Sequence, residues 1–331
     1  MRRPDTAAPM YEPSTDAMAS SRRLTNPRLL VPLGLLALYV NWGSTYLGIR
    51  FALESYPPFL LAGIRFLGAG VALYGFLRWR GMAPPTSLQW RNAAFTGLLL
   101  LGLGNGLVCF AEERVSSGIA AVAVASMPLF AALFTGMYGQ WPNRRESFGL
   151  AIGFAGVVVL NLGSSLSGSR LGAVALLVAA MCWAFGSAWS RRQEMPAGPM
   201  NTAAQMLCAS IALLAFGFLL GERLPSHPAP RATLALVYLG VFGSIVAFSA
   251  YLYVLKHARP ALATSYAYVN PPVAVLLGIL LAGERLGPYD VAGMAVILLG
   301  VIVITLGRAR GKGAPSTPRR RAAGGSENTG H

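Results

Sequence analysis

Long apolar runs separated by short polar segments dominate the chain. The runs cover residues 29–49, 59–77, 92–111, 119–138, 148–163, 171–189, 203–220, 232–255, 261–282 and 288–306. An α-helix rises ~1.5 Å per residue, so about 20 apolar residues cross a hydrocarbon layer of ~30 Å. The pattern therefore predicts an all-α polytopic membrane protein with ten transmembrane helices. The polar flanks, residues 1–28 and 308–331, are predicted to be disordered and cytoplasmic.

The two halves of the chain share a constant register. Adding 143 to the number of Pro128 gives Pro271, and the same offset places Gly43 on Gly186 and Gly97 on Gly240. This self-similarity predicts a tandem repeat of five helices, over residues 29–163 and 171–307. Because five is odd, the second copy enters the membrane upside down relative to the first. Inverted repeats of this kind are typical of secondary transporters, which work by alternating access.

Prolines interrupt the fourth and ninth runs near their middles. Pro128 lies in residues 119–138, and Pro271 and Pro272 lie in residues 261–282. A proline removes a backbone donor and clashes with the preceding turn, so we expect a helix break at each position. A break at membrane depth leaves backbone polar groups that lipid does not satisfy. Both breaks are therefore expected to face protein or a water-lined cavity.

Composition and charge support this class. Hydrophobic residues make up 54% of the chain, charged residues 12%, and the mean hydropathy is +0.53. With both termini placed inside, 20 Lys and Arg residues fall on that side and six on the other, while Arg65 lies within a span. By the positive-inside rule both termini are predicted to be cytoplasmic. The net charge of +15 is then mostly a topological signal, and no nucleic-acid partner is expected.

Residue types that carry catalytic or metal chemistry are sparse. Cys109, Cys182 and Cys208 lie in apolar runs without CxxC spacing, and the histidines form no zinc motif. The chain contains no phosphate-binding loop and no nucleophile paired with a base. We therefore expect neither an enzyme nor a cofactor or metal.

Polar and aromatic side chains cluster in three of the predicted helices. A substrate site between the repeats is predicted to draw on Asn41, Trp42, Tyr46, Trp183, Ser187, Tyr266, Tyr268 and Asn270. Aromatic rings would contact the apolar part of a solute, while amides and hydroxyls would orient its polar part. Tyr266 and Asn270 share one helix face, and Thr264 and Tyr268 share nearly the opposite one, so only one pair points fully into a cavity. Helix packing through small residues, with aromatics at the interface, is the alternative interpretation.

Three charged residues are further candidates, for substrate contact or ion coupling. Arg65, well inside a span, either attracts a substrate carboxylate or pairs structurally with Glu54, Glu112 or Glu113. Glu112 and Glu113 end the third run on the outer side and would carry a coupling proton if desolvated. Solvated surface carboxylates are the alternative.

Several segments resemble the EamA-domain proteins of the drug/metabolite transporter superfamily, in particular its inner-membrane exporters. The segments are NWGSTYLGIR, PPFLLAGIRF, GNGLV, SGIAAV and PALATSYAYVNPPVAVLLG, and the likeness runs from about Val31 to Gly307. The resemblance implies inverted five-plus-five repeats and export of metabolites, amino acids or drug-like compounds. The Gly-Glu that commonly ends the ninth helix in this family is Gly283-Glu284 here, whereas Trp141 stands at the matching place in the first repeat.

Together these observations predict a secondary active exporter in the bacterial inner membrane. Its expected partners are a small-molecule substrate and the lipid bilayer, and its expected state is a monomer or homodimer. Proton coupling is a possible driving force. A passive channel for small solutes is the alternative function.

Overall fold

The computed structural model describes residues 27–139, 141, 144–162, 169–257 and 266–311. Within these residues every regular element is a helix. The helices are α2 (Pro27–Ala52), α3 (Pro58–Trp79), α4 (Ser87–Gly97), η1 (Leu98–Asn105), α5 (Gly106–Glu112), α6 (Ser117–Val124), α7 (Met127–Met137), α8 (Arg144–Leu162), α10 (Arg170–Ser190), α11 (Pro199–Leu219), α12 (Pro230–Tyr238), η2 (Leu239–Val246), α13 (Ala247–His257), α15 (Tyr266–Ala282) and α16 (Pro288–Gly311).

Many of these helices have the length and composition of membrane spans. Among the described residues, seven are long and apolar enough to cross a bilayer, and three shorter apolar helices lie at residues 147–159, 269–282 and 288–303. Large apolar side chains point away from the protein, for example Leu219, Trp79 and Leu234, which are 84%, 79% and 71% exposed. A surface so apolar fits lipid rather than water. The prediction of an all-α, multi-pass membrane protein is confirmed by the helical elements and by the number of helices long enough to span a bilayer.

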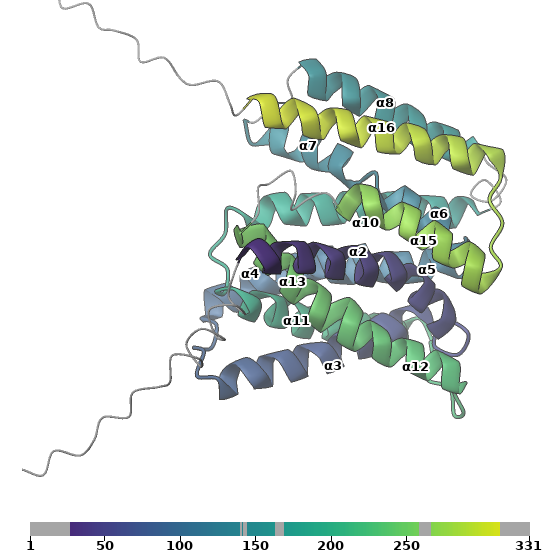
Figure 1. Ribbon diagram of the computed structural model, residues 1–331. Helices are drawn as coiled ribbons and strands as arrows, with labels where there is room; N and C mark the ends of the chain where they lie inside the picture. Colours follow the sequence, from purple (N-terminus) through teal and green to yellow (C-terminus); the bar gives the residue numbers. More distant parts are fainter. Residues whose placement is uncertain (1–26, 140, 142–143, 163–168, 258–265, 312–331) are drawn as a thin grey trace, which may run out of the picture.

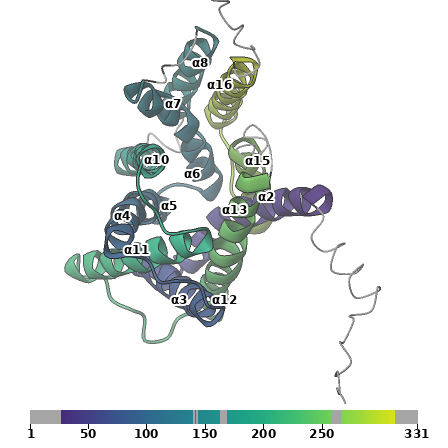
Figure 2. The ribbon, with the colours of Figure 1, turned by 90° about the vertical axis from the view of Figure 1, so that its left-hand side faces the viewer.

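The helices lie side by side in a bundle, with α2 beginning and α16 ending at the same end (Figure 1). Viewed along the bundle, α7, α8 and α16 form one flank and α3, α11 and α12 form the other (Figure 2). Between the flanks lie α2, α5, α6, α10 and α15. This middle group contains the candidate site.

The most extensive helix contacts join the two predicted repeats. They are those of α8 with α16 and of α3 with α11, the fifth and second helices of each repeat. A Cβ atom built on Gly300 would lie 2.6 Å from the Cα of Gly153, and one on Gly156 would lie 2.6 Å from the backbone nitrogen of Ile297. The backbones of α8 and α16 therefore touch, which glycine alone permits.

Two stretches of π-helix were not predicted from the sequence. η1 continues α4 into α5, and η2 continues α12 into α13, so each lies in the third helix of a predicted repeat. In η2, the hydroxyl of Ser244 donates a hydrogen bond of 3.0 Å to the carbonyl of Leu239, five residues earlier. A π-helical turn shifts the side chains that follow it and is often found at functional sites. Nothing in the apolar pattern distinguishes these stretches from α-helix.

The structure differs from the prediction at one of the two proline breaks. The first repeat does break: α6 ends at Val124, Ala125 and Ser126 form a turn, and α7 begins at Met127, one residue before Pro128. In the second repeat, α15 runs through Pro271 and Pro272 without interruption, so no break lies at these residues. A proline costs a helix one hydrogen bond and bends it, and tertiary packing can hold the helix together. The stretch before α15, residues 258–265, lies outside the described residues and includes Thr264.

The predicted disordered flanks lie mostly outside the described residues. At the C-terminal side, α16 continues to Gly311, past residue 306, where the last predicted span ends, so residues 308–311 are helical and not disordered as predicted.

Candidate functional site

A cavity lies in the middle of the bundle, where helices from both predicted repeats meet. Its volume is about 90 Å³, measured as the space open to the centre of a water molecule. The lining residues are Trp42, Thr45, Tyr46, Ile49, Arg65, Gly104, Asn105, Val108, Ala121, Val124, Ala125, Met127, Ala179, Trp183, Phe248, Tyr266, Asn270 and Pro271. Of the predicted substrate residues, Trp42, Tyr46, Trp183, Tyr266 and Asn270 are brought together here.

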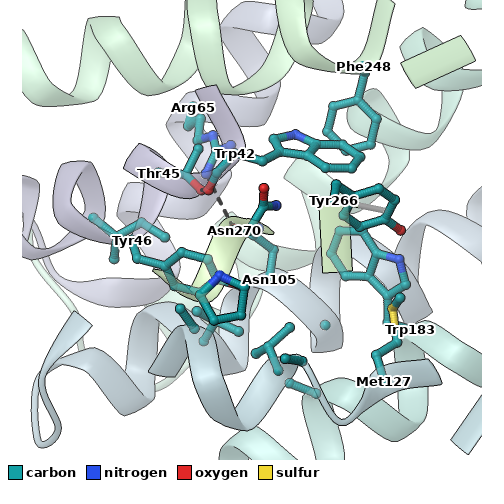
Figure 3. Close-up of a pocket in the computed structure, with 18 residues that line it drawn as sticks. Trp42, Thr45, Tyr46, Arg65, Asn105, Met127, Trp183, Phe248, Tyr266 and Asn270 are labelled. Atoms are coloured by element: carbon teal, nitrogen blue, oxygen red, sulfur yellow. Dashed lines mark hydrogen bonds between the residues drawn. The ribbon is translucent and has the colours of Figure 1, made fainter. Parts of the chain in front are cut away.

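Aromatic rings form one side of this cavity. Trp42 of α2 lies 4.9 Å from the ring of Tyr266 on α15 and 5.3 Å from that of Phe248 on α13, both edge to face. Trp183 of α10 lies close to Gly104 of η1, where a Cβ atom would approach the indole ring to 2.9 Å. Figure 3 shows these rings gathered on the side of the cavity away from Arg65. This side is suited to hold a flat apolar group by stacking.

Arg65 forms the opposite, polar side. Its side chain is buried, with 4% of the residue exposed, and it lines the cavity from α3. Nε donates to the hydroxyl of Ser244 at 2.9 Å. Nη1 donates to the side-chain oxygen of Asn105 at 3.4 Å; Arg65 and Asn105 are both drawn in Figure 3. Arg65 therefore bridges η2 and η1, one π-helical stretch from each predicted repeat.

No carboxylate of the described residues lies within ion-pair distance of Arg65. Glu54 instead lies 3.5 Å from Arg231, and Glu113 lies 2.7 Å from Arg114. Glu112 attracts Arg65 electrostatically but forms no ion pair with it. From the sequence, Arg65 was expected either to pair with one of these glutamates or to contact the substrate. Among the described residues it pairs with none of the three glutamates.

Asn270 contributes an unused acceptor. The residue is 8% exposed, and its Oδ1 atom has no hydrogen-bond partner among the described residues. Figure 3 places its amide between Arg65 and the aromatic side. Since Tyr266 and Asn270 both line the cavity, their shared face of α15 is the one that points inward. The backbone of Tyr268 belongs to α15, but its side chain lies outside the described part of the structure.

Glu112 and Glu113, adjacent in sequence, occupy different environments. Glu112 is fully buried, and neither carboxyl oxygen has a hydrogen-bond partner among the described residues. Glu113 is about one-third exposed and paired with Arg114. Both line a second, polar pocket of about 540 Å³, together with Arg50, Phe51, Leu53, Glu54, Arg231, Leu281 and Ala282. From the sequence, a glutamate was expected to carry a coupling proton only if its carboxyl is desolvated, and of the two only Glu112 is.

Two predicted substrate residues do not line the cavity. Asn41 precedes Trp42, and a helical turn of about 100° per residue directs it elsewhere. Its amide donates to the carbonyl of Ala37 at 2.7 Å, within α2. Ser187 lies one turn beyond Trp183 on α10, where the neighbouring Gly186 packs against Leu99 and Leu100 of η1. Pro128 also lies outside the lining, although Met127 beside it belongs to it.

The cavity also contains a residue that sequence reasoning did not select. Phe248 lies in an apolar run among several aromatic residues, and nothing in that run marks it. Thr45 and Asn105, two polar residues within predicted spans, also line the cavity but were not included in the predicted site. Both contribute to the polar side of the cavity. The amide of Asn105 within an apolar run was the feature of the sequence that could have indicated its role.

Comparisons with known proteins agree with this architecture. The model of the EamA-like transporter family matches twice, over residues 29–162 and 170–306. The inner membrane transporter YedA of Escherichia coli K12 is 47% identical over 284 residues, which cover 85% of this chain and 93% of that protein.

More distant relatives extend the same likeness. A chloroplastic WAT1-related protein of Arabidopsis thaliana is 25% identical, covering 82% of this chain and 68% of its own. Protein PecM of Dickeya dadantii is 27% identical, covering 80% and 88%. One crystal structure of a protein aligns with a TM-score of 0.59 at 21% identity, over 83% of this chain and 97% of that one, which supports the fold. The chain, matched over both halves, belongs to the EamA-like transporter family.

Proposed function

We propose that this protein is a secondary carrier that moves small solutes across the membrane by alternating access of two inverted five-helix repeats. The observation that carries the proposal is the cavity, which is lined by α2, α3 and η1 of the first family match and by α10, α13 and α15 of the second. The pairing of α8 with α16 and of α3 with α11 supports a two-fold relation between the repeats, because equivalent helices contact each other.

The solute of this carrier is a small molecule with an apolar part. Rings of Trp42, Tyr266 and Trp183 offer stacking surfaces, whereas Arg65 and Asn270 offer a donor and an acceptor. Few polar groups in a mostly apolar cavity are typical of small-molecule sites.

Export across an inner membrane, with both termini in the cytoplasm, is the proposed direction and placement. The excess of Lys and Arg on one side of the predicted spans supports the cytoplasmic placement of both termini, as does the start of α2 and the end of α16 at one end of the bundle (Figure 1). The Escherichia coli relative is named as an inner membrane transporter, which favours the same membrane.

Glu112 is the proposed carrier of a coupling proton. A carboxylate without hydrogen-bond donors costs far more to bury than a protonated carboxyl, so a change of cavity access would load or release the proton. Among the described residues, Glu284 after α15, Arg50 of α2 and Arg65 of α3 act electrostatically on Glu112.

Counter-flow in proteoliposomes tests this function. Purified protein would be reconstituted and screened with amino acids, other small metabolites and organic cations, with and without a proton gradient. A carrier shows saturable uptake of labelled solute driven by unlabelled solute inside. A passive channel, the alternative, gives flux proportional to concentration and no counter-flow. Absence of counter-flow for every solute would contradict the carrier.

A further inference from the structure

We propose that the cavity selects an organic anion, in which a carboxylate binds Arg65 and an aromatic or other flat apolar body lies among Trp42, Trp183 and Tyr266. The inference rests on the proposed carrier function and names its substrate class. It is carried by two features of one cavity: a buried cation that forms no ion pair among the described residues, and an aromatic wall opposite it.

The charge of Arg65 is not neutralised by the groups it touches. Its hydrogen-bond partners, the hydroxyl of Ser244 and the amide oxygen of Asn105, are neutral. Within the described part of the chain Nη2 makes no hydrogen bond, so the outer edge of the guanidinium keeps free donors. A buried cation inside a bilayer is costly unless an anion or several dipoles compensate it. A carboxylate that accepts hydrogen bonds from this edge of the guanidinium supplies the compensating negative charge. Its two oxygens match the planar arrangement of the N–H donors.

The guanidinium is held in place before any ligand binds. The hydroxyl of Ser244 is fixed by the hydrogen bond that it donates to the carbonyl of Leu239 in η2. Asn105 is the last residue of η1, so the helix backbone fixes its position. Gly243 leaves the room for this arrangement, since a Cβ atom there would lie 3.1 Å from Nη2 and 2.8 Å from Cγ2 of Thr45. A preorganised donor loses little entropy on binding, which favours a role in recognition.

The rest of the cavity sets the remaining features of the ligand. Arg65 is the one charged residue among the described lining, so a single carboxylate matches better than a multiply charged phosphate. The opposite wall is formed by the edge-to-face rings of Trp42, Phe248 and Tyr266. A solute with one carboxylate at one end and one ring at the other spans this arrangement.

Three probes of nearly equal shape test the charge preference directly. They are 3-phenylpropionate, its neutral amide and 3-phenylpropylamine, measured by calorimetry and by quenching of tryptophan fluorescence on the full-length protein in detergent. We expect the anion to bind at least ~10-fold more tightly than the amide, as a charge-assisted hydrogen bond exceeds a neutral one. The amine should bind more weakly than the amide. Equal affinity for anion and amide, preference for the amine, or no binding of any probe would overturn the proposal.

Variants assign the preference to Arg65. In Arg65→Gln the ratio of anion to amide affinity should fall to about one, whereas Arg65→Lys should keep part of it as a point charge. A preference that survives in Arg65→Gln overturns the assignment. If Arg65→Gln does not purify as a folded protein, the comparison of the three probes on the unchanged protein still decides the charge preference. Binding of the anion without counter-flow would contradict the carrier function alone, and counter-flow of neutral solutes alone would contradict the anion site alone.

Discussion

Glu284 Oε1 accepts two hydrogen bonds of 2.8 Å from Ser117, one from its backbone N–H and one from its hydroxyl. Oε2 accepts a third, at 3.1 Å, from the backbone N–H of Gly118. Ser117 and Gly118 begin α6 in the first half, whereas Glu284 follows α15 in the second. The carboxylate thus satisfies free N–H groups and the positive end of a helix in the opposite half.

Glu222 makes the same kind of contact for another helix. Its two carboxyl oxygens accept hydrogen bonds from the backbone N–H groups of Phe59 and Leu60, at 3.2 and 2.8 Å, in the first turn of α3. Each glutamate follows a glycine in the left-handed region, Gly221 at φ 81° and Gly283 at φ 64°. A left-handed glycine ends the helix and turns the next side chain back. The Gly-Glu pair therefore links the halves at two helix starts.

Replacement of Glu284 is expected to destabilise the protein without touching the cavity. Glu284→Ala should cost about 1–3 kcal/mol, because buried helix N–H groups lose their acceptor. Thermal unfolding of the purified protein in detergent measures the loss. Glu113→Ala is the matched control: its exposed ion pair with Arg114 is worth about 0–1 kcal/mol. Equal melting temperatures for Glu284→Ala and the unchanged protein would show that the cap contributes nothing.

Close packing of α8 on α16 predicts strong sensitivity at one glycine. Gly300→Ala should lower the melting temperature by several degrees, since its Cβ atom would meet the backbone of Gly153. Gly68→Ala provides the control, because a Cβ atom there has nothing within 4 Å and alanine favours the helix. If both variants melt alike, these two helices do not touch as described.

The inward face of α15 predicts which polar substitutions stop transport. Asn270→Leu and Tyr266→Leu should each reduce counter-flow at least ~10-fold while leaving membrane insertion intact, because the cavity loses its polar acceptor or an aromatic wall. Asn41→Leu should keep most of the activity, since Asn41 lies outside the lining. Transport by the purified Asn270→Leu protein at the parental rate would remove that residue from the site.

Burial of Glu112 predicts an uncoupled variant. Glu112→Gln is permanently neutral, so it should retain counter-flow but lose accumulation driven by a proton gradient. Glu113→Gln should remain driven, because its solvated carboxylate is already paired with Arg114. Accumulation is measured in proteoliposomes with an imposed pH difference. Undiminished gradient-driven accumulation by Glu112→Gln would exclude Glu112 as the proton carrier.

Hydrophobic patterning predicted the helices well but their internal irregularities poorly. Within the described residues, each predicted apolar run coincides with a helix or with helices in close succession. The break before Pro128 was expected, but the continuity of α15 through Pro271 was not, because proline removes one bond and packing decides whether the helix survives. The apolar pattern did not predict the π-helical stretches. A π-helical turn holds one more residue than an α-helical turn, and a continuous apolar run can form either.

For the site, helical periodicity identified candidate residues but not their partners. It paired Tyr266 with Asn270 on one face, and both line the cavity. It did not separate Trp42 from Asn41, or Trp183 from Ser187, because which part of a helix meets a cavity depends on its neighbours. The sequence by itself determined the membrane class and the two matching halves, since both depend on composition and spacing along the chain. Only the tertiary structure decided that Arg65 contacts neutral partners and that Glu112 is buried, because both depend on what distant helices bring to the same place.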